Sequence, residues 1–578
     1  MFWKKDGKCF FGELEMSIAK ELSKERKQKQ KDGIIPEWYT TAGYQLFKEK
    51  YDSSGNVKQR YETISKTLAN HYKGTRFCEK AESKFFELLW KGWLSPSTPI
   101  LANTGTNKGL SVSCSGNVVE DSIEGFYNAR RECAILTKQG FGTSSYIGNI
   151  RARGTPISTG GKASGILPVL KGFIQDSRDV SQGNTRRGAW AGYLNIEHGD
   201  FFEICDYVYN NPDDCNIGWI VSNSFIERLN SGDNEALLKY QKALKTKIVT
   251  GRGYFCFIDK INSRRIPEYV KNNHYVQASN LCNEIALFSD KDNTFSCVLS
   301  SLNIAKWDEW RDTDAVFWSV LFLDAVVEDL LVNAKGIPGL EKICNFASYS
   351  RAIGLGQCGW VTYLQDHNIP FESLEAQFFN SNISSYIQEK ALEASQTLAK
   401  ELGEPELLKG SGRRNSHLIA IAPTKSTALI MGGISEGISP FPANTYLQNT
   451  AGGEMNRINP SFLKLMKQKG MYNKNEIAKI TQNQGSVQTL EWLSPLEKQV
   501  FKTAFEIDQQ WILRFAEQRG KYIDQWQSLN LFFPEDCKEK QISEIHKQAF
   551  LSPNILGLYY CYTKAGVSGS TGECSVCQ

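Results

Sequence analysis

From about residue 95 to residue 450, the chain alternates short apolar runs with glycine-rich turns and stretches of helical periodicity. Such alternation is typical of α/β proteins, in which strands and covering helices follow one another. Helical periodicity also appears on either side of this part, over residues 37–93 and 490–520. We find no internal repeat. A chain of 578 residues has the length of three or four domains, although barrels of this length also occur as one unit.

The charges of the chain are nearly balanced, with 67 Lys and Arg against 63 Asp and Glu and a net charge of +4. This balance argues against a nucleic-acid-binding or membrane-binding surface. The N-terminus becomes charged where a signal peptide would be apolar. The best candidate for a membrane span, residues 315–334, contains Asp324, Glu328 and Asp329, and therefore predicts a buried helix.

The chain contains 15 cysteines but carries no visible export signal. This combination favours reduced thiols in the cytoplasm, where paired cysteines are more often catalytic or metal-binding than structural. The six histidines are far from one another in sequence, so we expect no histidine-based metal site.

The stretch Ser279–Glu284, SNLCNE, has an amide, a thiol and a carboxylate at alternate positions. If this stretch is extended, Asn280, Cys282 and Glu284 point to one side, because side chains alternate along a strand. Such a set can position a hydroxyl group, remove its proton and attack a neighbouring atom. A lone buried cysteine is more often a small core residue, but the polar partners on the same face weaken that alternative.

Two further cysteines, Cys114 and Cys297, lie in strand-like apolar surroundings and would each be assigned to the core if taken alone. Cys574 and Cys577 form a CxxC at the end of the chain, after the Gly/Ser-rich stretch KAGVSGSTGE. The sequence offers no second CxxC or Cys/His pair to complete a zinc site, so this tail favours thiol–disulfide exchange. The segment from Tyr560 to Cys574 has a span of roughly 20 Å and a limit near ~48 Å, enough to reach an active site from the surface.

Two glycine-rich stretches resemble nucleotide-binding loops. Gly354, Gly356 and Gly359 form a GxGxxG pattern, but the residues before it make a poor strand, so we expect a tight turn packed on a helix. Gly160–Lys162 resembles part of a phosphate loop, but Ala163 stands where Ser or Thr would bind magnesium. We therefore expect a simple turn there.

A series of motifs in a fixed order is the most specific feature of the chain. These are SPSTPILANTGT, SCSGNVVEDS, NIRARGTPI, SQGNTRRGA, NLCNEI, CVLSSLN, APTKSTALIMG, LYYCYT and the terminal CxxC. Each is weak alone, but together they resemble the large (alpha) catalytic subunit of ribonucleotide reductase of the class I-like type. The resemblance begins near Trp38 and continues to the C-terminus.

The resemblance implies an α/β fold, a ten-stranded barrel made of two five-stranded halves, with a finger loop inside that carries Cys282. We expect a helical N-terminal region over residues 1–93, the barrel over 94–560 and a flexible redox tail over 561–578.

The resemblance also implies how the residues act in the reduction of ribonucleotides to deoxyribonucleotides. Cys282 would become the thiyl radical that removes the 3′ hydrogen of the substrate. Glu284 would act as base on the 3′ hydroxyl, and Asn280 would hydrogen-bond the substrate. Cys114 and Cys297 would be the reducing pair and would finish as a disulfide. Cys574 and Cys577 would then reduce that disulfide and be reduced in turn by thioredoxin or glutaredoxin.

Further positions match the substrate and effector sites of the family. The residues expected at the substrate are Thr98, Ser113, Pro423, Thr424, Lys425, Ser426 and Thr427. Thr424–Thr427 would form the phosphate loop, although many relatives have an acid where Lys425 stands. Asp121, Arg151 and Arg186 match the site where a deoxynucleoside triphosphate or ATP selects the substrate. Asp121, with Glu124 three positions later, also predicts a helix start. The helix that follows would pair with its copy in a homodimer.

The adjacent Tyr559 and Tyr560 match the tyrosine pair that relays an oxidising equivalent from a radical-generating small (beta) subunit with a dimetal centre. Adjacent aromatic residues are usually packing residues, so this assignment depends on the resemblance. We expect no covalently bound cofactor in this chain. The alternatives are an adenosylcobalamin-dependent (class II) reductase, which needs no small subunit, and an inactive thiol-redox or regulatory homologue.

Many relatives have an N-terminal ATP-cone of roughly 90 residues, in which dATP switches the enzyme off. About 37 residues precede the resemblance here, too few for such a domain. We therefore expect triphosphates to select the substrate without dATP inhibition through a cone. Titration of dATP against CDP reduction would test this expectation.

Overall fold

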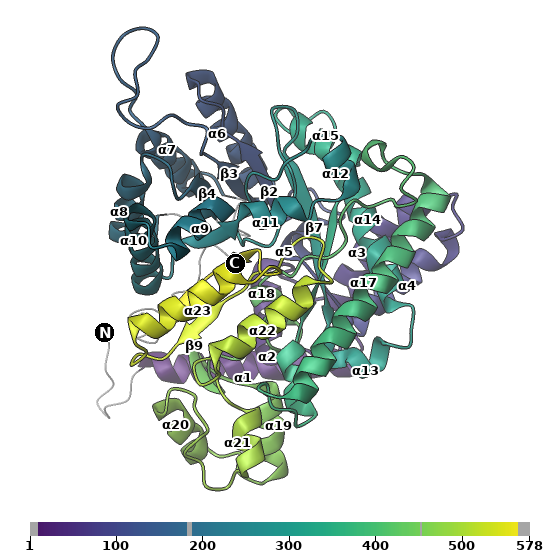
Figure 1. Cartoon of the computed structure of the whole chain (residues 1–578). Coiled ribbons are helices and arrows are strands. Elements are labelled where there is room, and N and C mark those ends of the chain that lie inside the picture. The colour runs from purple at the N-terminus through teal and green to yellow at the C-terminus, as the bar shows by residue number, and fades with distance from the viewer. Residues whose placement is uncertain (1–9, 182–187, 215, 451–452, 564–578) are drawn as a thin grey trace.

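The computed structural model describes residues 10–181, 188–214, 216–450 and 453–563 (Figure 1). Its N-terminal part is helical, as expected over residues 37–93. Here Tyr44, Phe47, Tyr61, Leu68 and Phe85 are fully buried, because they recur at helical spacing on the inner faces. The helices are α1 (Phe10–Lys31), α2 (Thr41–Lys50), α3 (Val57–Ala69), α4 (Cys78–Trp90) and α5 (Thr98–Asn103), with a 3₁₀ helix at Asn70–Tyr72.

Five parallel strands form the first half of the central barrel. They pair in the order β2-β3-β4-β5-β6. Their bounds are β2 (Cys114–Val118), β3 (Gly142–Tyr146), β4 (Trp190–Asn195), β5 (Asn216–Val221) and β6 (Tyr254–Phe257). The strands are buried along almost their whole length, as parallel strands covered on both faces are.

The second half is less regular. Strand β7 (Phe295–Asn303) pairs in parallel with β8 (Ile353–Cys358). Beyond β8 the neighbouring segments are joined by single parallel bridges, one between Leu355 and Ile419 and one between Ile421 and Gln527. The neighbouring segment contains β11 (Leu531–Phe533), which lies parallel to β13 (Cys561–Thr563).

Two antiparallel contacts close the ring. Strand β2 pairs with β7, and β6 pairs with β12 (Gly557–Leu558). Within the described residues, ten segments thus form the barrel, namely β2, β3, β4, β5, β6, β7, β8, 419–421, 525–533 and 557–563. The expected barrel of two five-stranded halves is confirmed. The short strand β1 (Leu94–Pro96) adds to β7, and a hairpin of β9 (Thr445–Thr450) and β10 (Gly453–Ile458) lies apart from the ring.

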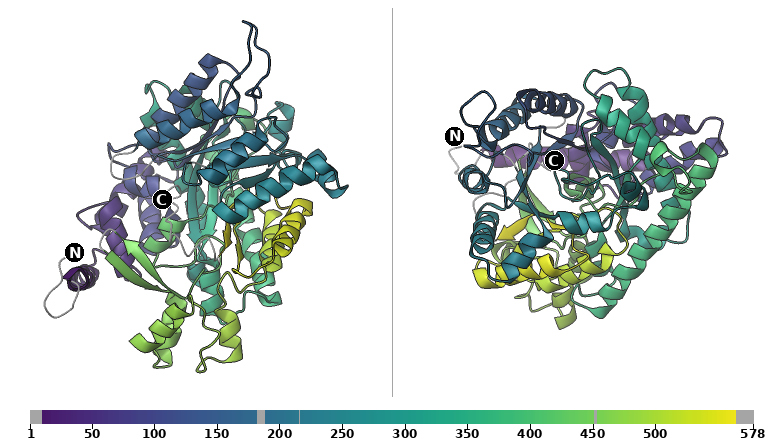
Figure 2. Two further views of the ribbon diagram at one scale, coloured as in Figure 1. Left: turned by 90° about the vertical axis from the view of Figure 1, so that its left-hand side faces the viewer. Right: turned by 45° about the horizontal axis from the view of Figure 1, so that its top comes forward.

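Helices surround the strands (Figure 2). The bounds after β2 are α6 (Ile123–Lys138), α7 (Ile166–Asp179), α8 (Phe201–Asn210), α9 (Asn223–Asn230), α10 (Asn234–Thr250), α11 (Ile258–Ser263) and α12 (Pro267–Lys271). Those after β7 are α13 (Trp307–Trp310), α14 (Ala315–Ala334), α15 (Glu341–Ser350), α16 (Trp360–Asp366), α17 (Leu374–Leu402), α18 (Lys425–Ile430), α19 (Pro460–Gln468), α20 (Lys474–Gln482), α21 (Pro495–Val500), α22 (Gln509–Gly520) and α23 (Glu539–Leu551), with 3₁₀ helices at Ile304–Lys306 and Glu406–Leu408.

The apolar stretch over residues 315–334 is helix α14, and most of its side chains are buried, as predicted. Asp324 is buried there because Arg351 and Arg414 bind its carboxylate, each at 3.0 Å. No helix among the described residues is long and apolar enough to cross a membrane.

Three local predictions were wrong or incomplete. The cap of α6 is Ser122, whose hydroxyl accepts a hydrogen bond from the amide of Gly125, and Asp121 lies one residue before it. The helix predicted over 490–520 is interrupted between α21 and α22. Gly354 and Gly356 lie inside strand β8, whereas Gly359 has a left-handed backbone directly before α16. Close packing requires glycine at residue 356, since a Cβ there would come within 2.7 Å of the carbonyl oxygen of Ala420. The expected turn at Gly160–Lys162 is confirmed.

Candidate functional site

A loop with the motif NLCNEI enters the barrel between α12 and β7. It does not form a strand, because Leu281–Asn283 turn back on themselves and Asn283 has a left-handed backbone with φ of 61°. The side chain of Asn280 closes the turn, since its Oδ1 accepts hydrogen bonds from the amides of Glu284 at 3.0 Å and Ile285 at 3.2 Å. A turn, and not strand alternation, therefore brings the side chain of Asn280 to the backbone of Glu284. We call residues 277–290 the finger loop.

The first half of the barrel holds the backbone of the finger loop. The phenol of Tyr193 on β4 donates to the carbonyl of Asn280 at 2.6 Å, and Ser144 on β3 donates to the carbonyl of Ser279 at 2.8 Å. The amide group of Asn283 donates to the carbonyl of Phe255 on β6 at 3.2 Å. Three strands thus fix the turn.

The second half holds Cys282 within the turn and Glu284 directly after it. The amide of Trp526 donates to the carbonyl of Glu284 at 2.9 Å. The hydroxyl of Ser528 lies 2.7 Å from the carbonyl oxygen of Cys282 and 3.1 Å from Oε2 of Glu284. Sequence inspection did not identify Ser528 or Tyr193, because neither stands in a pattern that signals the distant loop it contacts.

The carboxyl group of Glu284 is buried, with 1% of the residue exposed. Burial disfavours its charged form and raises its pKa to about 7, although hydrogen bonds from Asn280 and Ser528 act in the opposite direction. A carboxyl group with this pKa can accept and release a proton near neutral pH, which suits a general base.

Cys114 and Cys297 face each other across the antiparallel seam between the two halves. They are direct partners in the register of β2 and β7. Opposite residues in such a pair have Cα atoms about 4.5–5.5 Å apart and side chains on the same face. This separation lies within the range that a disulfide can bridge. Both cysteines are free thiols in the structure.

Amide groups contact both thiols. Nδ2 of Asn280 lies 3.3 Å from Sγ of Cys114, so the finger loop reaches the cysteine pair. Nε2 of Gln525 lies 3.4 Å from Sγ of Cys297. Burial raises the pKa of Cys297 far above its usual value, and Glu284 adds to this effect. The thiol therefore keeps its hydrogen, which hydrogen-atom transfer requires.

Tyr559 and Tyr560 belong to a larger cluster of buried tyrosines. Their ring centroids are 4.1 Å apart, and Tyr254 on β6 lies 4.8 Å from the ring of Tyr559. The hydroxyl of Tyr254 lies 3.3 Å from that of Tyr560, and Arg252 donates to Tyr560 at 3.2 Å. Tyr254 was missed in the sequence, where it appears only as one aromatic residue of an apolar strand.

The expected substrate residues come from separate parts of the chain. Thr98 begins helix α5 and shares a hydrogen bond with the hydroxyl of Tyr51 at 3.2 Å. Ser113 lies directly before Cys114 and has a buried hydroxyl with no partner within the described residues. Pro423 precedes Thr424, which has a left-handed backbone and stands directly before the six-residue helix α18. Lys425, Ser426 and Thr427 form the first turn of that helix.

Two of the three expected effector residues form an ion pair. Arg151 contacts Asp121 at 2.6 Å, and both side chains are partly exposed. Arg186 lies outside the described residues, as do Cys574 and Cys577.

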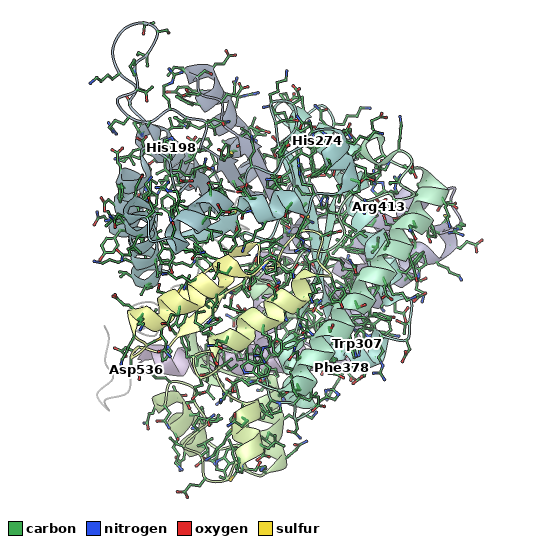
Figure 3. The ribbon with its side chains drawn as sticks, viewed as in Figure 1. His198, His274, Trp307, Phe378, Arg413 and Asp536 are labelled. Carbon is green, nitrogen blue, oxygen red and sulfur yellow. The ribbon has the colours of Figure 1, made fainter. Side chains whose placement is uncertain are left out.

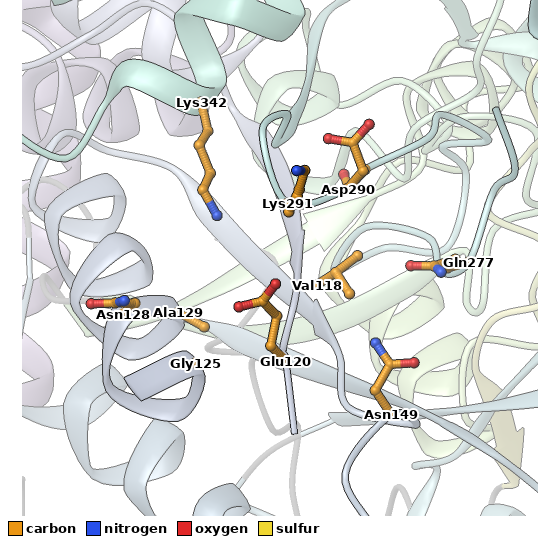
Figure 4. Close-up of a pocket in the computed structure, with 11 residues that line it drawn as sticks. Val118, Glu120, Gly125, Asn128, Ala129, Asn149, Gln277, Asp290, Lys291 and Lys342 are labelled. Carbon is orange, nitrogen blue, oxygen red and sulfur yellow. The ribbon is translucent and has the colours of Figure 1, made fainter. Parts of the chain in front are cut away.

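A cavity of about 260 Å³ lies between helix α6 and the two ends of the finger loop (Figure 4). Its lining includes Gln277 and Ser289 of the finger loop, Glu120 and Asn149 near the effector residues, and Lys342 of α15. None of Cys114, Cys282 and Cys297 lines it. The cavity therefore adjoins the ends of the finger loop, and not the thiols.

The labelled His198 and His274 lie in different parts of the molecule (Figure 3). Among the residues that the structure places, no group of three His, Cys, Asp or Glu side chains has an arrangement that would hold a metal ion.

Comparisons with known proteins agree with this geometry. The chain matches the family "Ribonucleotide reductase, barrel domain" over residues 112–243, 239–411 and 405–560. It is 34% identical over 545 residues to the putative ribonucleoside-diphosphate reductase large subunit of Frog virus 3, covering 89% of this chain and 94% of the relative. It is 28% identical over 563 residues to the ribonucleoside-diphosphate reductase large subunit of Vaccinia virus, covering 83% and 72%.

A solved structure is also similar. The class Id ribonucleotide reductase alpha subunit of Actinobacillus ureae matches with a TM-score of 0.84 and 36% sequence identity, covering 92% of this chain and 99% of that chain. The chain belongs to the ribonucleotide reductase family as a large subunit of the class I type, and ribonucleotide reduction is its activity.

Proposed function

We propose that the chain reduces ribonucleoside diphosphates through a thiyl radical on Cys282. The observation that carries this proposal is the meeting of three segments at one place. Cys114 lies opposite Cys297, and Asn280 of the finger loop contacts the thiol of Cys114. This arrangement supports a site at which a radical carrier, a base and a two-electron reductant would act on one substrate.

The reaction balances with these residues. The Cys282 radical takes the 3′ hydrogen atom of the substrate and becomes a thiol, while Glu284 accepts the proton of the 3′ hydroxyl. The 2′ hydroxyl leaves as water with a proton from the Cys114–Cys297 pair. The pair gives its second hydrogen to the 2′ carbon, supplies two electrons in all and becomes a disulfide. Glu284 returns its proton to the 3′ oxygen, and Cys282 returns the hydrogen atom to the 3′ carbon. Cys574 and Cys577 then reduce the disulfide by thiol exchange and are regenerated by thioredoxin or glutaredoxin.

The radical would reach Cys282 through Tyr560 and Tyr559 from a small subunit with a dimetal centre. The ring contact of 4.1 Å between the two tyrosines supports this path. The similarity to a class Id alpha subunit favours it over the adenosylcobalamin alternative. Turnover with adenosylcobalamin and without a partner protein would contradict it.

Deoxynucleoside triphosphates or ATP would bind at Asp121, Arg151 and Arg186 and select the substrate, whose phosphates would lie at Pro423–Thr427. A homodimer would form along helix α6. Its exposed Ile123 and Tyr127 support this, since they are 71% and 62% exposed in the single chain. Residues 1–93 and 94–560 would act as N-terminal region and barrel, and 561–578 as redox tail. The first residues of the expected tail, Cys561–Thr563, form strand β13 and belong to the barrel wall, so the tail would begin after Thr563.

A turnover assay with CDP, dithiothreitol and the small subunit tests the proposal. We expect dCDP from the wild-type chain and none from Cys282→Ser, which should still bind nucleotides because only the radical carrier is lost. If Cys282→Ser forms dCDP, the assignment of the radical to Cys282 is wrong.

A further inference from the structure

Ser528 lies where the second half of the barrel meets the finger loop. Its backbone amide donates to the carbonyl of Ile421 at 2.9 Å, which fixes it in the barrel wall, and it is 3% exposed. Its hydroxyl oxygen is within hydrogen-bond distance of two acceptors, the Cys282 carbonyl at 2.7 Å and Glu284 Oε2 at 3.1 Å. A serine hydroxyl has one proton, so it can donate to only one acceptor at a time.

We infer that Ser528 is a positioning residue that couples the protonation of Glu284 to the placement of Cys282. This inference rests on the proposed function, in which Glu284 is the base and Cys282 the radical carrier.

The coupling follows because the Ser528 hydroxyl has one proton for two acceptors, the Glu284 carboxyl group and the Cys282 carbonyl. When Glu284 is ionised, its Oε2 is the stronger acceptor, because hydrogen bonds to charged groups are the stronger ones. When Glu284 has taken a proton, it can donate that proton to the Ser528 oxygen. The serine proton is then released to the carbonyl of Cys282. When Glu284 takes up a proton, the hydrogen bond from Ser528 to the backbone carbonyl of Cys282 thus becomes stronger. Cys282 is the residue whose thiol must return a hydrogen atom to the substrate.

Other titratable groups also act near Glu284. Tyr193 of β4 faces it from the first half, and burial, together with the nearby Cys256, Glu284 and Cys282, raises the pKa of this phenol far above its usual value. Cys297 of β7 faces it from the seam. These groups stay uncharged near neutral pH, so Ser528 and Asn280 are the side chains that favour the ionised form of Glu284.

The test is the pH dependence of the Ser528→Ala variant. Removing the donor should raise the pKa of Glu284 by about one unit from its value of about 7. The base must be ionised to act, so the acidic limb of the single-turnover rate should move to higher pH. The rate at pH 7 should fall about five-fold and recover at higher pH. Infrared titration of the protonated Glu284 carboxyl band, identified by its loss in Glu284→Gln, should move by the same amount.

Ser144→Ala is the matched control, because Ser144 also donates to a finger-loop carbonyl but does not contact Glu284. Its carboxyl titration should match the wild type. Ser528→Cys keeps a weak donor, so it should raise the pKa of Glu284 by less than Ser528→Ala does. If circular dichroism shows that Ser528→Ala is unfolded, the titration of Ser528→Cys tests the inference instead.

Unchanged Glu284 titration in the folded Ser528 variants would overturn the inference, as would an equal shift in Ser144→Ala. The infrared measurement needs no turnover. A wild-type chain that forms no dCDP would therefore count against the proposed function alone, while the role of Ser528 would still be decided.

Discussion

The two halves of the barrel hold the same finger loop in different ways. The first half consists of five strands with continuous ladders. Tyr193 and Ser144 donate to backbone carbonyls of the loop, and the carbonyl of Phe255 accepts from the side chain of Asn283. The second half continues past β8 by single bridges. Trp526 and Ser528 donate to the backbone carbonyls of Glu284 and Cys282, and Ser528 also contacts the carboxyl group of Glu284. The regular half therefore sets where the loop turns. The irregular half sets the surroundings of the Glu284 carboxyl group, the proposed base.

This difference separates two kinds of mutational effect. Changes in the first half should cost stability and leave the pH dependence in place. Changes in the second half, or at the seam between the halves, should alter the chemistry with a smaller cost in stability.

The largest effect is expected at the seam. Cys114→Ser and Cys297→Ser should each reduce repeated turnover to below about a hundredth of the wild type, because the reducing pair acts as a unit. The change of sulfur to oxygen should affect the melting temperature little. Steady-state dCDP formation measures the first effect. After one turnover without added reductant, mass spectrometry of a Cys574→Ser/Cys577→Ser variant, whose tail cannot reduce the pair, should find the Cys114–Cys297 disulfide. A different disulfide partner for either cysteine would contradict the assignment.

Tyr560→Phe should also abolish turnover with the small subunit, because it removes the phenolic proton and keeps the ring. The lost hydrogen bonds to Arg252 and Tyr254 should lower the free energy of unfolding by only about 1 kcal/mol. Turnover assays and denaturant titration measure the two quantities. Full activity in Tyr560→Phe would show that the radical does not pass through this phenol.

Tyr193→Phe is expected to have the smallest effect on chemistry. It leaves the buried carbonyl of Asn280 without its donor, which should lower the free energy of unfolding by about 1–3 kcal/mol. The acidic limb of the rate profile should stay near that of the wild type, unlike in Ser528→Ala. Denaturant titration and a pH profile on the same protein make the comparison. If Tyr193→Phe shifts the acidic limb of the rate profile and leaves the free energy of unfolding unchanged, the roles that we assign to the two halves are wrong.

Local patterns in the sequence determined much of this protein. The alternation of apolar runs and helices predicted an α/β fold, and the polarity of residues 315–334 predicted a buried helix, because periodicity and burial are local properties of the chain. The ordered motifs identified the family and the residues at the candidate site.

The tertiary structure decided what the sequence left open. The register of β2 and β7 places Cys114 opposite Cys297, and the turn at Leu281–Asn283 replaces the strand that alternation suggested. Tyr254 contacts Tyr559 and Tyr560, and Ser528 contacts Cys282 and Glu284, although each is distant in sequence from its partners. Register and such contacts depend on how whole segments pack across the barrel, and no spacing within one segment encodes that packing.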